Sequence, residues 1–192
     1  ILLEGARLDD LNLRNYRQTV ARDSGEVTLL APQGARGAQD AFFGWESRTN
    51  GATASVADSY SGWTAPEDAL LTPQTPVTLT LTGPNGVEIT RTIAIDDNFM
   101  FTITDRVRNT SAAAQELRPF GTVRREGMPQ HFRNNAIVHQ GLIGVWGPRQ
   151  YRASTFQQAG KHARERARGR VGEDQRIQDM QGTGGWFGIT EH

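Results

Sequence analysis

Alternating hydrophobic and polar residues are most regular in the middle of the chain. In Val77–Thr82 the odd positions are apolar and the even positions are threonine, and the alternation resumes over Val87–Ile95. This period of two is typical of strands with one buried face. Between the two runs, Gly83-Pro84-Asn85-Gly86 has the composition of a tight turn. We therefore predict a β-hairpin, with Gly86 at positive φ at its tip.

The same pattern extends beyond this hairpin. After Asp96-Asp97-Asn98, which we interpret as a turn, alternation from Phe99 to Val107 predicts a third consecutive antiparallel strand. Shorter apolar stretches predict further strands at 11–13, 27–30, 117–123, 137–146 and 150–156. Segment 33–65 is rich in Gly, Ala, Ser and Gln, so we expect long loops there. These elements predict an all-β fold, a single antiparallel β-sandwich.

Two charged residues interrupt the apolar side of the central strands. Arg91 and Asp105 lie at positions that the alternation assigns to the buried face of neighbouring strands. Because an isolated buried charge is very unfavourable, we expect the two side chains to form an ion pair. A ligand site built from the same two side chains is the alternative.

Composition and motifs exclude several classes of function. The 21 basic and 21 acidic residues cancel, which removes bulk charge as a reason to bind nucleic acid. The chain has no cysteine, no apolar run long enough to span a bilayer, no Gly-x-Ser-x-Gly elbow and no His-Glu-x-x-His pair. His131 and His139 could share a metal only if the chain folded back between them. We therefore predict no catalytic residue, no metal and no cofactor.

One segment departs from the β pattern. Residues 157–181 contain few apolar side chains, and arginine recurs at positions 164, 166, 168 and 170. We interpret the segment as a solvated, variable insertion whose acidic residues offset much of the charge. A patch that binds anionic lipid or nucleic acid is the alternative.

Aromatic residues suggest an alternative function. Large β-sandwiches with aromatic-lined clefts often bind sugars, and Trp45, Trp63 and Trp146 are available for such a cleft. A carbohydrate-binding or sugar-epimerase-like sandwich needs these indoles beside converging polar groups. Tryptophans in a β-core also serve in packing, so the sequence leaves both interpretations open.

Five stretches, in order, carry a more specific signal. They are GARLDDLNLRNYRQTV at 5–20, FFGWES at 42–47, TRTIAIDDNFMFTITDRVRN at 90–109, GTVRREGMPQHFRNNAIVHQGLIGVWG at 121–147 and GTGGWFGIT at 182–190. Together they resemble the first periplasmic domain of the YidC family of membrane protein insertases of Gram-negative bacteria. The resemblance covers most of 1–156 and 182–191 and finds no counterpart for 157–181. His139-Gln140-Gly141 stands where many relatives have His-Glu-Gly, so a role for that carboxylate cannot be transferred.

The resemblance implies a fold, a location and partners. The fold would be a twisted two-sheet sandwich of the mutarotase-like supersandwich type, at the periplasmic face of the bacterial inner membrane. The domain would be a scaffold and docking surface for accessory subunits of the Sec translocon, particularly of the SecDF type, and for nascent membrane proteins. It would also contact the membrane-embedded remainder of its own chain, which carries the insertase chemistry. The domain itself would then not be an enzyme.

The resemblance also suggests boundaries. We expect a β-sandwich domain at 1–156, the arginine-rich insertion at 157–181, and a membrane-proximal linker at 182–192 that leads to a transmembrane helix outside this chain. In the linker, Gly184 and Gly185 let the chain turn sharply, and Trp186, Phe187 and Ile189 supply apolar groups. Because an indole favours an apolar–aqueous boundary, we expect Trp186 to be an interface anchor. The alternative is that these residues form a last strand.

Overall fold

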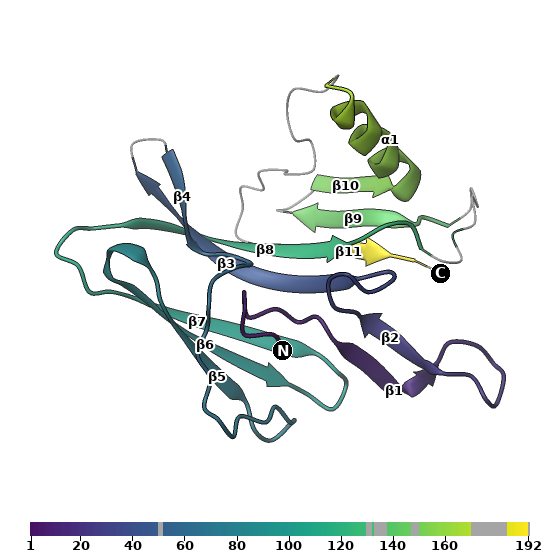
Figure 1. Ribbon diagram of the computed structural model, residues 1–192, viewed down its shortest axis with the longest axis horizontal. Coiled ribbons are helices and arrows are strands. Elements are labelled where there is room, and N and C mark those ends of the chain that lie inside the picture. The colour runs from purple at the N-terminus through teal and green to yellow at the C-terminus, as the bar shows by residue number, and fades with distance from the viewer. Residues whose placement is uncertain (50–51, 130–131, 133–137, 147–149, 170–183, 192) are drawn as a thin grey trace. The chain divides into compact units, whose positions relative to one another are not determined.

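Antiparallel strands make up most of the computed structural model, which describes residues 1–49, 52–129, 132, 138–146, 150–169 and 184–191 (Figure 1). The predicted all-β class is therefore confirmed. The chain divides into two compact units, Ile1–Glu126 and Gly127–His192. The described residues include no helix that is both long and apolar enough to span a membrane.

The first unit contains three antiparallel sheets among its described residues. One sheet pairs β1 with β2, the second has the order β4-β3-β8, and the third has the order β5-β6-β7 (Figure 1). The strands are β1 (Leu11–Arg17), β2 (Glu26–Leu30), β3 (Gln39–Thr49), β4 (Ala52–Ala57), β5 (Val77–Thr82), β6 (Val87–Ile95), β7 (Phe101–Asn109) and β8 (Glu116–Arg125).

The β5-β6-β7 sheet confirms the central prediction. Strand β5 has the predicted bounds, and its odd positions point inward while its threonines point outward. A short 3₁₀ turn, Pro84–Gly86, joins β5 to β6. Gly86 has φ 75°, as predicted, and Asn85 also lies in the left-handed region with φ 55°. In the next turn, the carboxylate of Asp96 accepts hydrogen bonds from two backbone N–H groups, so its role there is structural.

The expectation of long loops over 33–65 is wrong, because β3 and β4 lie in that segment. Strand β3 pairs with β8 along ten residues, from Gln39 opposite Arg125 to Arg48 opposite Glu116. Gly44 lies opposite Phe120, and a Cβ on Gly44 would overlap that ring. The ring of Phe120 packs edge-to-face against Phe42, at 6.1 Å between centroids. The glycine that suggested a loop here is thus part of a strand, where it leaves room for the ring of Phe120.

The core of the first unit lies between the β4-β3-β8 and β5-β6-β7 sheets. Buried side chains from both sheets form one cluster, and partly buried ones from β3, β7 and β8 pack against it. The buried members are Ala6, Val56, Ala57, Trp63, Val77, Leu79, Val87, Ile89 and Ile93. Two antiparallel sheets that share an apolar interior form a β-sandwich.

The described residues of the second unit form a three-stranded sheet of order β10-β9-β11 and one helix. Its elements are β9 (Gly141–Trp146), β10 (Gln150–Thr155), α1 (Phe156–Ala167) and β11 (Gly185–Thr190). The ring of Phe156, at the start of α1, packs edge-to-face on Phe132 at 6.2 Å. The strands at 141–155, expected within the first domain, thus belong to the second unit, and the segment expected as a linker contains β11.

Candidate functional site

Arg91 and Asp105 form the ion pair that the sequence predicted. The two residues lie directly opposite each other on β6 and β7. Arg91 Nε donates to Asp105 Oδ1 at 2.8 Å, and Arg91 Nη2 donates to Asp105 Oδ2 at 2.7 Å. The arginine side chain is fully buried and the aspartate is 12% exposed. Such a bidentate, charge-assisted contact is among the strong hydrogen-bonded pairs in proteins.

Two of the three candidate cleft tryptophans surround this ion pair. The guanidinium carbon of Arg91 lies 4.4 Å from the ring centroid of Trp63, and Trp45 Nε1 donates to Asp105 Oδ2 at 2.8 Å. Trp63 is 4% exposed, so its ring is covered by the core and by Arg91 rather than open to a sugar. Trp146 belongs to β9, and its side chain lies outside the described residues. Trp63 is thus buried in the core, and half-buried Trp45 is held by its hydrogen bond to Asp105.

Sequence reasoning missed that the tryptophans join the ion pair. Trp45 reaches Asp105 from the opposite sheet, across 60 positions of sequence. No local sequence pattern predicts such a contact. The alternation of apolar and polar residues assigns a side chain to one face of a strand, but it does not identify which residues of another sheet pack against that face. The only available signal was that two charges on a buried face need further donors and acceptors.

The second group of candidate residues lies on an edge strand. Strand β11 pairs with β9, so that Trp186 is opposite Val145, Phe187 is opposite Gly144 and Ile189 is opposite Leu142. The end of the strand is held by Thr190 Oγ1, which donates to the backbone oxygen of His139 at 3.1 Å. Residues 185–190 are thus part of a sheet.

Several apolar side chains of this sheet are exposed. Trp186 is 55% exposed, Phe187 is 40% exposed and Leu142 is 41% exposed. Ile189 is half-buried, and Gly184 and Gly185 are exposed. Because neighbouring residues of a strand point to opposite faces, Trp186 lies on one face of the sheet and Phe187, Ile189 and Leu142 lie on the other. We call the second group, Leu142, Phe187 and Ile189, the β11 apolar face.

Polar side chains do not assemble into a metal centre in the described part of the chain, where no group of three or more potential ligands is found. His139 Nε2 instead lies 3.0 Å from the backbone oxygen of Leu142. His131 and His192 and the side chain of His162 lie outside the described residues. Gln140, at the position where many relatives are expected to carry a carboxylate, is buried with 7% exposure.

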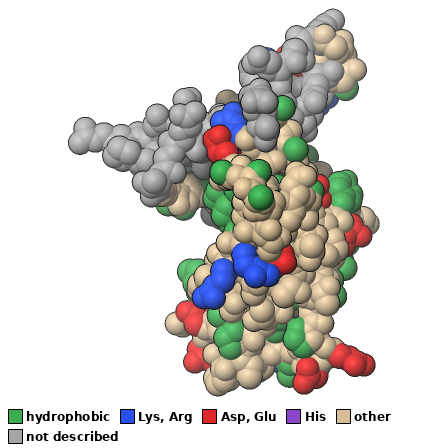
Figure 2. Space-filling model, turned by 90° about the vertical axis from the view of Figure 1, so that its left-hand side faces the viewer, with side chains coloured by type: hydrophobic (Ala, Val, Ile, Leu, Met, Phe, Trp, Pro, Cys, Tyr) green, Lys and Arg blue, Asp and Glu red, His purple; other side chains and the backbone are tan. Residues whose placement is uncertain are grey.

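The space-filling view of one face of the molecule shows how exposed hydrophobic side chains are distributed (Figure 2). In Figure 2 the hydrophobic side chains of the described residues appear in small separate groups among polar atoms. Scattered groups of this kind are normal for soluble proteins, whereas exposed apolar residues that share one sheet face, as Leu142 and Phe187 do, indicate an interaction site. The end of the second unit's sheet is therefore the candidate site.

Comparison with known proteins identifies relatives over the whole chain. The family profile described as YidC periplasmic domain matches residues 1–192, a range that includes 157–181. The membrane protein insertase YidC of Caulobacter vibrioides is 40% identical over 191 residues, which is 100% of this chain and 29% of the relative. The protein of the same name from Maricaulis maris is 39% identical over 189 residues, 98% of this chain and 29% of the relative. The membrane protein insertase YidC of a Ruegeria species is 41% identical over 145 residues, which is 76% of this chain and 24% of the relative.

The chain thus spans less than a third of the length of these relatives. No solved structure matches it significantly.

Proposed function

Because the chain belongs to the family of YidC periplasmic domains, we propose that it is the periplasmic docking and scaffolding part of a membrane protein insertase. Its partners in this proposal are accessory subunits of the Sec translocon, of the SecDF type, and nascent membrane proteins. The domain would stand at the periplasmic face of the inner membrane, next to the membrane-embedded remainder of its own protein.

The exposed end of the second sheet is the observation that supports this proposal. Leu142 and Phe187 are each about two-fifths exposed on one face of that sheet. Phe187 lies opposite Gly144, which has no side chain to cover the ring. Removing such apolar surface from water is favourable by about 25 cal/mol per Å². The β11 apolar face, where Leu142 and Phe187 lie on the same side of one sheet, would therefore gain from a covering protein.

Trp186 points to the other face and fits a second role at the same end. An indole has a large apolar ring with one N–H donor, which favours the boundary between lipid headgroups and acyl chains. We propose that Trp186 contacts the membrane interface while the β11 apolar face contacts protein. This assignment keeps both alternatives from the sequence, because Trp186 belongs to a strand and is also exposed.

We further propose that the domain does not catalyse a reaction. Docking requires a surface and a stable scaffold, and neither requires a nucleophile, a metal or a cofactor. In this proposal the ion pair of Arg91 and Asp105 with its two tryptophans is part of the scaffold.

Site-specific photocrosslinking in the full-length protein tests the docking role. A photoreactive amino acid at Leu142 or Phe187 should form adducts with a SecDF-type subunit or a radiolabelled nascent membrane protein, identified by antibody or mass spectrometry. Matched control positions are Tyr60 and Leu70, which are 78% and 72% exposed in the first unit. Adducts at the control positions but not at Leu142 or Phe187 would contradict the proposal.

A further inference from the structure

Helix α1 presents a row of basic side chains on one side. Lys161, Arg164 and Arg168 are spaced by three and four residues, so they project from neighbouring positions of successive helical turns. The backbone N–H of Arg168 donates to the oxygens of Arg164 and Glu165, so the helical turn continues to Arg168. We call Lys161, Arg164 and Arg168 the α1 basic row.

The α1 basic row faces solvent. All three residues are exposed, whereas Phe156 at the start of the helix is buried against Phe132. Arg164 and Arg168 lie four residues apart, on the same side of the helix. The side chain of Arg166 and all of Arg170 lie outside the described residues.

The charge of the row is largely uncompensated. Lys161 Nζ lies 3.9 Å from Glu165 Oε1, at the outer limit for an ion pair. Arg164 and Arg168 form no ion pair within the part of the chain that the structure describes. Between positions 156 and 169 the sequence carries four basic residues and one acidic residue. The row is therefore a local positive surface on a chain whose net charge is zero.

We propose that the α1 basic row binds the anionic headgroups of membrane phospholipids. Charge complementarity favours phosphate, and the membership of the chain in a family of membrane protein insertases favours lipid as its source. Apart from the small side chain of Ala167, the exposed residues of α1 in the described part of the chain are polar or basic, so the helix would lie on the headgroups without entering the acyl chains. This inference concerns lipid and does not depend on a protein partner.

The expected strength is modest and additive. One basic side chain close to an anionic membrane strengthens binding about fivefold, so three strengthen it about a hundredfold. Such binding is weak for a free domain but becomes effective when the rest of the protein holds the domain at the membrane, because tethering raises the local concentration.

Sedimentation with lipid vesicles tests the proposal. The 192-residue chain should bind vesicles of mixed phosphatidylglycerol and phosphatidylcholine more strongly than vesicles of phosphatidylcholine alone, and salt should weaken this binding. The triple variant K161Q/R164Q/R168Q should lose about a hundredfold in partition coefficient. The assay contains no protein partner, so its failure and a failure of the docking role are distinguishable.

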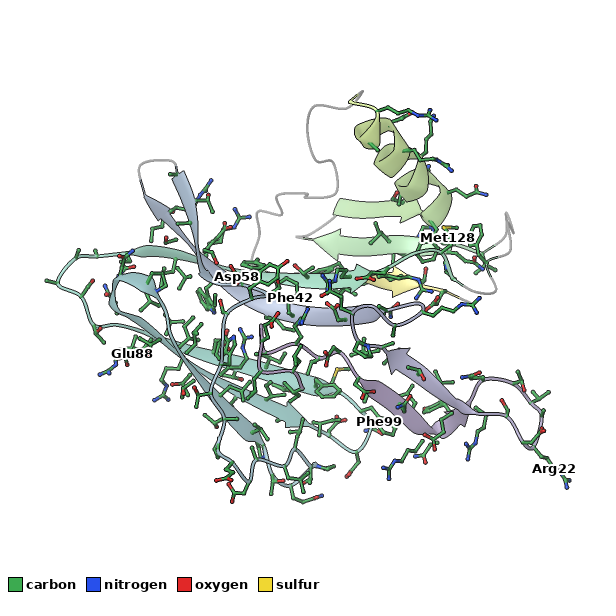
Figure 3. The ribbon with its side chains drawn as sticks, in the orientation of Figure 1. Arg22, Phe42, Asp58, Glu88, Phe99 and Met128 are labelled. Atoms are coloured by element: carbon green, nitrogen blue, oxygen red, sulfur yellow. The ribbon has the colours of Figure 1, made fainter. Side chains whose placement is uncertain are left out.

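A matched control removes the same charge elsewhere. The triple variant R14Q/R22Q/R36Q changes three exposed arginines of the first unit, one of which, Arg22, extends away from the strands in Figure 3. It should keep the affinity of the parent chain. Because basic residues near a helix C-terminus also stabilise the helix, R164K/R168K keeps the charge as a second control and should bind like the parent. Equal losses in both Gln triples, no preference for phosphatidylglycerol, or an unaffected K161Q/R164Q/R168Q would each overturn the proposal.

Discussion

At the scale of single residues, the centre of the first unit combines charge with aromatic packing. The guanidinium of Arg91 contacts a carboxylate at its edge and an indole on its face, and that carboxylate also accepts a hydrogen bond from Trp45. A buried pair of this kind rarely adds net stability over apolar residues of similar volume, but breaking one is costly because the other charge stays buried. The contacts of the pair with two tryptophans suggest that it fixes how the two sheets are aligned.

Removing one partner should therefore be strongly destabilising. Arg91→Met leaves Asp105 without its bidentate partner and should lower the free energy of unfolding by about 3–5 kcal/mol, measured by urea titration. The double variant R91M/D105L removes both charges and should recover most of that loss. A double variant as unstable as Arg91→Met alone would contradict this interpretation.

The same two strands provide a control for that experiment. Arg108 and Glu88 are also directly opposite on β7 and β6, but their side chains are 70% and 41% exposed. Solvent screens such a pair, so Arg108→Met should cost no more than about 1 kcal/mol. The comparison separates the effect of burial from the effect of pairing.

At Gly86, at the tip of the β5–β6 hairpin, backbone conformation limits substitution. At φ 75° any side chain is strained, and a Cβ there would lie 2.8 Å from Thr110 Oγ1. Gly86→Ala should cost about 1 kcal/mol or more of unfolding free energy in urea titration. Gly62→Ala, where no atom lies within 4 Å of the added Cβ, is the control and should change little. A Gly86→Ala variant as stable as the parent would contradict the assignment.

At the scale of elements, the sequence predicted those strands whose own residues show a clear alternation of buried and exposed positions. Strands β5, β6 and β7 follow from a period of two, because each buries one face and is joined to the next by a recognisable turn. Strand β3 was missed because it pairs on one side with β8, about 80 residues away, and its glycine accommodates the ring of Phe120. The ion pair was predictable from the free-energy cost of burying an unpaired charge, whereas its contacts with the two tryptophans depend on how the sheets pack together.

Strand β11 illustrates an intermediate case. Its glycines suggested a flexible linker and its aromatic residues suggested an anchor, but its pairing with β9 depends on residues about 40 to 50 positions earlier. An exposed Trp186 on a fixed strand is a better anchor than one on a flexible linker, because less conformational entropy is lost on binding.

Tryptophan quenching measures whether Trp186 contacts lipid. In the full-length protein in membranes, brominated lipids should quench a fraction of the fluorescence that disappears in Trp186→Phe. In the 192-residue chain without lipid, the fluorescence lost on this substitution should be red-shifted, because the indole is 55% exposed. Equal quenching of parent and variant, with a blue-shifted loss, would show that Trp186 is a packing residue and not an anchor.

At the scale of the whole molecule, the two units carry different features. The first unit holds the whole buried core cluster and the ion pair, whereas the second holds the β11 apolar face and the α1 basic row. In the described residues, every named strand pairs with strands of its own unit. In the proposed function, the scaffold and the binding surface therefore lie in different segments of the chain.

This division predicts how fragments behave. Fragment 1–126 cuts no ladder between the described strands and keeps the core cluster, so it should unfold cooperatively in urea and give a near-ultraviolet circular dichroism signal from packed Trp45 and Trp63. Fragment 1–156, which ends at the boundary expected from the sequence, keeps β9 and β10 but lacks β11. It exposes the edge of β9 that β11 covers, and unpaired strand edges promote association between copies. It should therefore aggregate more than either fragment 1–126 or the whole chain, measured by light scattering at equal concentration. If fragment 1–126 is unfolded while fragment 1–156 is folded and monomeric, the first unit depends on β9 and β10, and the boundary lies where the sequence pattern placed it.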